Sequence, residues 1–287
     1  MKKSISLSLI VAISSLFLLI SCAKDDKEVD TETQSVVDNA ICERQFMAVV
    51  PVVYTKGINE AGIKKIATTC ETFTILGAIG SGTPNVIADT VVDANGFYQN
   101  GPVTFQVDYG TLGCEGADGV LRTGKINITA EKRWSQLSNT TVTVDLVSFN
   151  ANSINYSGKI KISKPDSVTY TVEVVNGRCT NGTWNIDYIG TKTIKQIVGY
   201  STKADESDDV ISITGSSSGK NREGRNFTTN ITGSLIKKSN CKHISSGTVD
   251  VTPDGFKTRT VDFGNGSCDD DATYTVNGQT ISFKLSN

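Results

Sequence analysis

The sequence predicts an all-β fold, either an antiparallel β-sandwich or a barrel-like meander, of about 12–15 strands with one N-terminal helix. Two observations predict it. Beyond residue 70, short stretches that alternate apolar and polar residues follow one another along the chain. Asn-Gly and Asp-Gly dipeptides, such as Asn176-Gly177, Asp254-Gly255 and Asn277-Gly278, punctuate these stretches. Alternation buries one face of an antiparallel strand, and the dipeptides supply the positive φ that type I′ hairpin turns require.

The composition limits the classes of function. Of the 287 residues, 38% are hydrophobic and 20% are charged, a balance with which a chain can bury a core. The formal net charge of −2 provides no basic surface for phosphates, so we expect no nucleic-acid partner. A single histidine excludes a multi-histidine metal site, and we expect neither a metal nor a cofactor.

Residues 1–21 are typical of a signal peptide, because Lys2 and Lys3 precede an apolar run that is short for a membrane span. The run ends in Leu19-Ile-Ser-Cys22, which resembles the lipobox of bacterial lipoproteins. This resemblance implies cleavage before Cys22 and lipidation of that cysteine, which gives a stable membrane anchor. The alternative is an ordinary secretory signal followed by a chance cysteine.

Residues 22–35 comprise the lipidated cysteine and a flexible tether without apolar periodicity. The charged run Lys24-Asp-Asp-Lys-Glu28 resembles the signal that sends Bacteroidetes lipoproteins to the outer face of the outer membrane. We therefore expect a lipid-anchored outer-membrane protein that is exposed at the cell surface. A solvated charged tether on a protein that faces the periplasm is the alternative.

Residues 36–287 form the β-rich domain, which begins with the helix. From Ser35 to Val53 apolar residues recur mostly at helical spacing, and Pro51 limits the far end. An internal boundary between two halves near residue 164 is one option. The apolar stripe of the helix consists of Val36, Val37, Ala40, Ile41, Val49, Val50 and Val53. The clearest strands are Lys125–Thr129, Thr141–Val144, Lys159–Ser163, Val168–Val172, Val210–Ile213, Thr248–Val251 and Thr280–Lys284.

Two segments, Val107–Cys114 and Val261–Cys268, repeat the pattern Val-Asp-aromatic-Gly-x3-Cys. Each has an upstream cysteine that opens a strand. We interpret them as two similar hairpin units inside one domain, with chance similarity between strands rich in Thr and Val as the alternative.

Six cysteines remain once Cys22 is lipidated, and in an exported protein they indicate disulfides. Equivalent cysteines of the two hairpin units should play equivalent roles, and the remaining two would tie the helix to the sheet. We therefore predict the pairs Cys70–Cys114, Cys241–Cys268 and Cys42–Cys179. Each bridge should stabilise the fold by about 3–4 kcal/mol.

No catalytic constellation stands out. Gly215-Ser-Ser-Ser-Gly219 fits the nucleophile elbow G-x-S-x-G, but it lacks the helix that must follow an elbow and favours a hairpin turn. His243, the single candidate base, lies two residues after a cysteine that we predict in a disulfide. We therefore expect no enzyme. The alternative is an envelope glycan hydrolase, whose two carboxylates the sequence does not single out.

Several short motifs concern ligands and modification. Asp269–Asp271 and Asp205–Asp209 are acidic clusters without the spacing of a calcium loop, so solvated turns are the better interpretation. Asp89-Thr-Val91 and Asp166-Ser-Val168 resemble the O-glycosylation sequon of exported Bacteroidetes proteins, which makes Thr90 and Ser167 candidate sites. The aromatic residues available for stacking on a sugar are Trp134, Trp184, Tyr156 and Tyr188.

The chain resembles a family of uncharacterised Bacteroidetes (flavobacterial) lipoproteins of the cell surface or outer membrane. The resemblance rests on Val107–Cys114 with Gly119–Ile126, on Ser207–Gly215 with Asn221–Gly224, and on Thr258–Cys268. It implies a location and a β-fold but no mechanism. We expect a lipid-anchored binding or structural module of the envelope, with a glycan or a protein as its ligand.

Overall fold

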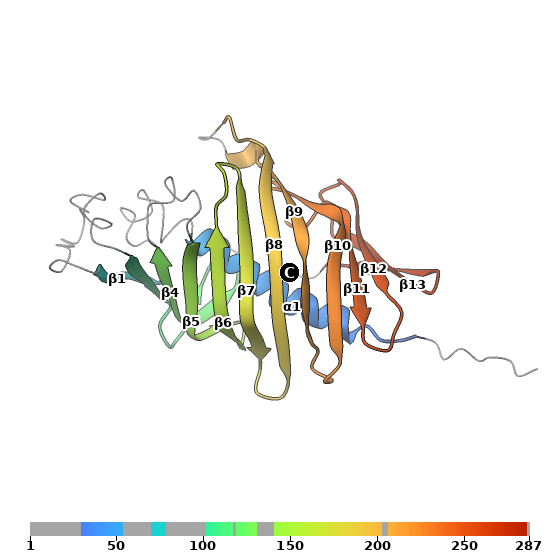
Figure 1. The fold of residues 1–287 in the computed structure, drawn as a ribbon, viewed down its shortest axis with the longest axis horizontal. Coiled ribbons are helices and arrows are strands. Elements are labelled where there is room, and N and C mark those ends of the chain that lie inside the picture. The colour runs from blue at the N-terminus through green and yellow to red at the C-terminus, as the bar shows by residue number, and fades with distance from the viewer. Residues whose placement is uncertain are drawn as a thin grey trace, which may run out of the picture.

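The computed structural model describes residues 30–53, 70–78, 102–116, 119–130, 141–202 and 206–285. These residues form one antiparallel meander sheet of 14 strands, which does not close, with one helix across one face (Figure 1). Strands pair with their neighbours in sequence, except that β2 pairs with β4. The short β3, which lies between them in the sequence, also pairs with β4. The predicted antiparallel all-β fold with an N-terminal helix is confirmed, and of the two predicted shapes the structure adopts the meander.

The helix α1 spans Gln34–Val52, within one residue of the predicted bounds at each end. The strands are β1 (Thr72–Ala78), β2 (Val103–Asp108), β3 (Cys114–Glu115), β4 (Leu121–Ala130), β5 (Thr141–Ala151), β6 (Ile154–Ser163), β7 (Thr169–Thr180), β8 (Asn185–Val198), β9 (Val210–Lys220), β10 (Asn226–Lys238), β11 (Ser246–Pro253), β12 (Arg259–Asn265), β13 (Asp271–Val276) and β14 (Gln279–Lys284).

The turn dipeptides have two different roles in the sheet. Asn277 and Gly278, with φ of 52° and 75°, form the tight turn between β13 and β14 as predicted. Asn176 also has a positive φ of 50°, but it lies inside β7, where the pairing with β8 shifts register. The prediction of a hairpin turn at Asn176-Gly177 is therefore wrong, because the same left-handed backbone serves a β-bulge there.

The core lies between the sheet and the second half of α1, which contacts β7 and β8. Phe46 of the helix stacks on Tyr188 with ring centroids 5.6 Å apart and meets Tyr156 edge-on at 5.9 Å. These two tyrosines are buried, so they cannot form an exposed platform for a sugar. β6 ends just before residue 164 and β7 begins just after it. These two strands pair with each other, so the sheet is continuous at the optional boundary near residue 164.

The two predicted hairpin units are β1–β2 and β11–β12, and they share one local feature. Asp108 accepts a hydrogen bond from the backbone N–H of Gly110 at 2.8 Å, and Asp262 accepts one from Gly264 at the same distance. Both glycines have positive φ. The repeated Val-Asp-aromatic-Gly pattern therefore encodes the same Asp–Gly hydrogen bond, with a left-handed glycine, near the end of both second strands.

Two local expectations are wrong. Val37 of the predicted apolar stripe is 48% exposed and Ala40 is exposed too, while polar residues of the first half of α1 are buried instead. The segment Gly215–Gly219 is no hairpin turn but part of β9, paired on both sides with β8 and β10. In both places a neighbouring element supplies partners that the local sequence does not show.

Candidate functional site at the start of the helix

The first half of α1 lies on the sheet through polar side chains. Ser35, Asp38 and Asn39 are buried, at the i, i+3 and i+4 spacing that places them on one helical face. The same face continues into the apolar residues Cys42 and Phe46. Because buried polar groups are costly unless they are paired, this half of the helix depends on partners from β9 and from the turn that follows it.

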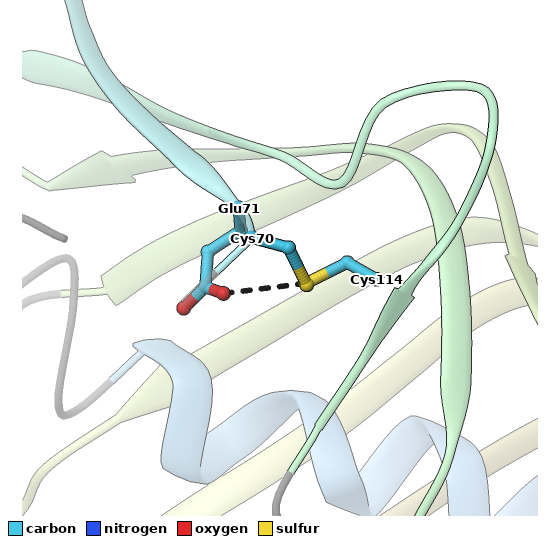
Figure 2. A group of neighbouring side chains, drawn as sticks. All are labelled: Cys70, Glu71 and Cys114. Carbon is cyan, nitrogen blue, oxygen red and sulfur yellow. Dashed lines mark hydrogen bonds between the residues drawn. A yellow bond between two sulfur atoms is a disulfide. The ribbon is translucent and has the colours of Figure 1, made fainter. Parts of the chain in front are cut away.

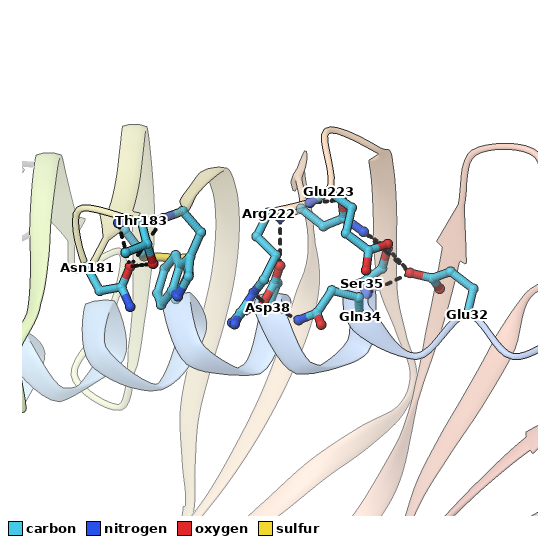
Figure 3. Close-up of polar contacts among 12 residues, drawn as sticks. Glu32, Gln34, Ser35, Asp38, Asn181, Thr183, Arg222 and Glu223 are labelled. Carbon is cyan, nitrogen blue, oxygen red and sulfur yellow. Dashed lines mark hydrogen bonds and ion pairs between the residues drawn. A yellow bond between two sulfur atoms is a disulfide. The ribbon is translucent and has the colours of Figure 1, made fainter.

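Asp38 and Arg222 form the central contact of this interface (Figure 3). The guanidinium Nε donates to one carboxylate oxygen at 2.8 Å, and Nη2 lies 2.6 Å from the same oxygen. The backbone N–H of Arg222 donates to the other oxygen at 2.8 Å. The ring of Trp184, from the hairpin between β7 and β8, covers the guanidinium at 4.3 Å. Asp38 is wholly buried, so these charge-assisted bonds replace its lost hydration.

Glu32 and Arg259 hold the residues just before the helix. Glu32 Oε1 accepts hydrogen bonds from the backbone N–H and the hydroxyl of Ser35, both at 2.8 Å, which satisfies one free N–H of the first turn. Arg259 of β12 is 0% exposed; its Nε donates to the backbone carbonyl of Glu32 at 2.7 Å and its Nη2 pairs with Asp30. This arginine therefore fixes where the helix begins on the sheet.

A half-open pocket of about 270 Å³ lies beside this start of the helix. Arg225 borders it, with its guanidinium stacked over the ring of Phe256 at 4.3 Å and its Nη1 donating to the Asp254 carbonyl at 3.2 Å. The pocket is lined by Thr31, Glu32, Thr33, Gln34, Glu223, Arg225 and Phe256. It is smaller than the roughly 300–1,000 Å³ of pockets that enclose a whole ligand, so its size suits the end of a larger molecule.

The pocket is lined mainly by polar and charged side chains. It offers guanidinium donors, hydroxyls, an amide and carboxylate acceptors around one aromatic edge. Two carboxylates line it, but Glu32 is already occupied by Ser35, Asn221 and Arg259. Glu223 lines the same pocket, from the turn between β9 and β10.

A second polar cluster lies deeper under the helix and is closed. Lys192 of β8 is 1% exposed, and its Nζ lies 3.2 Å from the carboxylate of Glu43. Ser217, the middle residue of the G-x-S-x-G match, is buried and donates to Asn39 Oδ1 at 2.9 Å. Burial, reinforced by the nearby Glu43 carboxylate, raises the pKa of Tyr188 far above its usual range. Because its hydroxyl donates to Asn39 of α1, Ser217 faces the helix.

The structure forms the three disulfides in the pairing that the sequence predicts, Cys42–Cys179, Cys70–Cys114 and Cys241–Cys268. Figure 2 shows the second, where the Glu71 carboxylate lies 3.4 Å from Cys114 Sγ. The ligand atoms of Cys70, Glu71 and Cys114 lie within 4.8 Å of one another, as in a metal site. Because the two sulfurs are bonded to each other, neither is a thiolate, and the trio does not fit a metal ion.

Three disulfides indicate a protein that folds outside the cytoplasm. Within the described residues, none of the helices is both long and apolar enough to cross a bilayer. Cys22 and Thr90 lie outside the described residues, as do Trp134 and the Asp205 end of one acidic cluster.

The remaining predicted residues lie in turns. Ser167 is exposed at the tip between β6 and β7, where Asp166 accepts hydrogen bonds from the N–H groups of Val168 and Thr169 at 2.9 and 2.7 Å. The turn alone therefore accounts for Asp166. Asp270 and Asp271 pair with Lys284 at 2.6 and 2.7 Å. His243 lies in the loop before β11.

Comparisons with protein-family models, with curated proteins and with solved structures find no match for this chain.

Sequence reasoning missed the pocket and the polar half of the helix. The partners Asp38 and Arg222 are 184 residues apart, and Arg259 lies 227 residues after Glu32. One signal was present: Ser35, Asp38, Asn39 and Cys42 share a helical face with Phe46. A polar stripe in line with an apolar one indicates burial beside charged partners, although it does not name them.

Proposed function

We propose that this protein is a lipid-anchored, non-enzymatic binding module of the cell envelope, and that the pocket at the start of α1 holds the end of an acidic glycan. The observation that carries the proposal is the composition of the pocket wall. Arg225 supplies a guanidinium for a carboxylate, while Glu223, Gln34 and the threonines supply acceptors and donors for hydroxyl groups.

The place of the pocket supports this proposal. Thr31, Glu32 and Thr33 belong to the last part of the predicted tether, directly before the helix, and the turns between β9 and β10 and between β11 and β12 complete the wall. Arg259 holds one lining residue, Glu32, in place through its hydrogen bond and ion pair. A site that is ordered in advance loses less entropy on binding, which favours affinity.

Binding can be tested with acidic and neutral oligosaccharides on an array and by calorimetry. We expect the protein to bind acidic oligosaccharides and the variant Arg225→Gln to lose at least about tenfold in affinity, since hydrogen bonds to charged groups contribute about 1.5–3 kcal/mol. Arg178→Gln is the matched control, because Arg178 is half exposed on the far strand pair β7–β8. Equal affinity of Arg225→Gln and Arg178→Gln, or no acidic glycan bound, would contradict the proposal.

The anchor and the orientation need a separate experiment. Intact cells that express the wild type or Cys22→Ala would be fractionated and treated with protease. We expect the wild type in the membrane fraction and digested while a periplasmic marker survives, and Cys22→Ala released from the membrane. Resistance of the wild type until the outer membrane is broken would place the protein on the periplasmic side instead.

A further inference from the structure

Strand β14 is the last strand of the open sheet, and its outer edge is unpaired among the described residues. It pairs with β13 through six consecutive residue pairs without a register shift. The tight turn at Asn277-Gly278 makes Val276 and Gln279 a hydrogen-bonded pair, and such pairs alternate along an antiparallel ladder. The N–H and C=O groups of Thr280, Ser282 and Lys284 therefore point away from β13.

This edge has few of the features with which proteins protect sheet edges. It has no proline and no bulge, and its side chains are exposed apart from a half-buried Phe283. Its one charge, Lys284, is neutralised within the chain by Asp270 and Asp271. Ile281 is 45% exposed, on the same face of the strand as Phe283. A regular, neutral edge with exposed apolar side chains is suited to pairing with another strand.

We propose that β14 pairs with β14 of a second copy of this chain, antiparallel about a two-fold axis at Ser282. This register engages all three outward-facing residues, since Ser282 meets the second Ser282 and Thr280 meets Lys284 of the other copy. Each of these pairs exchanges two hydrogen bonds. Other registers leave at least one of the three residues unpaired.

The side chains fit the same register. Ile281 of each copy lies opposite Phe283 of the other in the closely spaced, non-hydrogen-bonded position, where an aliphatic and an aromatic side chain pack well. Lys284 faces an uncharged threonine, and the two lysines are kept apart by the length of the strand. Both copies already hold Lys284 in ion pairs with their own aspartates, so no charge is left without a partner.

The contact is small, because each copy contributes a strand of six residues. It buries less than the roughly 1,600 Å² of a standard interface, so we expect a dimer that dissociates at low concentration in solution. On a membrane, an anchored chain would meet its partner at a higher effective concentration.

The oligomeric state of soluble Cys22→Ala protein can be measured by sedimentation equilibrium over a wide concentration range. We expect a reversible dimer, and we expect Ser282→Pro to be monomeric, since proline removes an N–H that faces outward and takes no part in pairing with β13. Ser282→Thr, which keeps that N–H, should still dimerise. A wild type that stays monomeric throughout, or a Ser282→Pro that dimerises as well as wild type, overturns the proposal.

Cysteine cross-linking tests the register without a proline. Under oxidation Ser282→Cys should form a covalent dimer, because Cα atoms in a hydrogen-bonded pair are about 5.5 Å apart, within disulfide range. Thr280→Cys is the matched control, because four residues of strand, about 13 Å, separate the two copies of Thr280. Equal cross-linking of both variants, or none by Ser282→Cys, contradicts the two-fold axis at Ser282.

Discussion

The two halves of α1 lie on the same sheet but are held by different forces. The second half buries Phe46 and Val49 and is joined to β7 by the disulfide Cys42–Cys179. The first half buries Asp38, which Arg222 neutralises. Apolar burial stabilises in proportion to area and has no direction, whereas a buried ion pair adds little net free energy and is strict in geometry. The comparison teaches that one half supplies stability and the other half supplies position.

The largest expected effect belongs to the disulfide of the apolar half. Replacing Cys42 and Cys179 together by alanine should cost up to about 5 kcal/mol, because that bridge closes the longest loop, with a sequence separation of 137. Denaturant unfolding under non-reducing conditions measures the loss. Removing Cys241–Cys268, with a separation of 27, should cost less; the reverse order would break the comparison.

The next effect isolates packing. Phe46→Ala should reduce the free energy of unfolding by about 3–5 kcal/mol, because it removes a wholly buried ring that contacts Tyr156 and Tyr188. Val37→Ala is the control on the same helix, since Val37 is half exposed and should change stability by less than about 0.5 kcal/mol. Similar losses for the two variants would mean that the helix is not held by its apolar face.

A smaller effect distinguishes the two partners of a buried ion pair. Lys192 is 1% exposed and Glu43 is 20% exposed. Glu43→Gln leaves a buried ammonium without its carboxylate and should cost about 2–4 kcal/mol, whereas Lys192→Met replaces the charge by an apolar chain and should cost less than about 1.5 kcal/mol. Thermal or urea unfolding of both variants gives the order. If Lys192→Met were the more harmful change, the ion pair would supply stability and the comparison would fail.

The smallest effect concerns a partly exposed carboxylate of β2, Asp108. The N–H of Gly110, followed by Lys125, holds the pKa of Asp108 below its ordinary value. A lowered pKa in the folded state stabilises the fold above the unfolded pKa, and this contribution is lost as the pH falls through the folded pKa. Asp108→Asn should therefore unfold with a shallower dependence on pH below about pH 4. An NMR titration of Asp108 with an ordinary pKa would refute the argument.

Sequence reasoning found what local patterns encode. The alternation of Lys125–Thr129 and Lys159–Ser163 identifies strands because burial with a period of two needs no knowledge of the partner strand. The two Val-Asp-aromatic-Gly segments pointed to equivalent disulfides because each carries a cysteine at the same spacing, and both share the Asp–Gly hydrogen bond. Asn277-Gly278 identified its hairpin turn for the same local reason.

What the sequence could not show depends on distant partners. From the sequence alone, Asp38 would be a surface residue of a helix. Its burial depends on the turn that carries Arg222, because the ion pair offsets the cost of removing the carboxylate from water. Val37 reads as core, yet it is exposed because the polar face is the one that the sheet accepts. Gly215–Gly219 reads as a turn, although β8 and β10 hold it as a strand. The pocket combines residues from three separate segments and has no local signature.

The meander also sets an order in time. Each strand meets its partner as soon as the next strand follows, so the sheet can grow in the direction in which the chain emerges. The helix comes before every strand, yet it needs Cys179, Arg222 and Arg259. The first described element to reach the compartment in which the protein folds is therefore the last to be completed, and a chain halted after β8 would present a half-docked helix with bare carboxylates. Quality control that senses this one helix would test whether nearly the whole sheet has arrived.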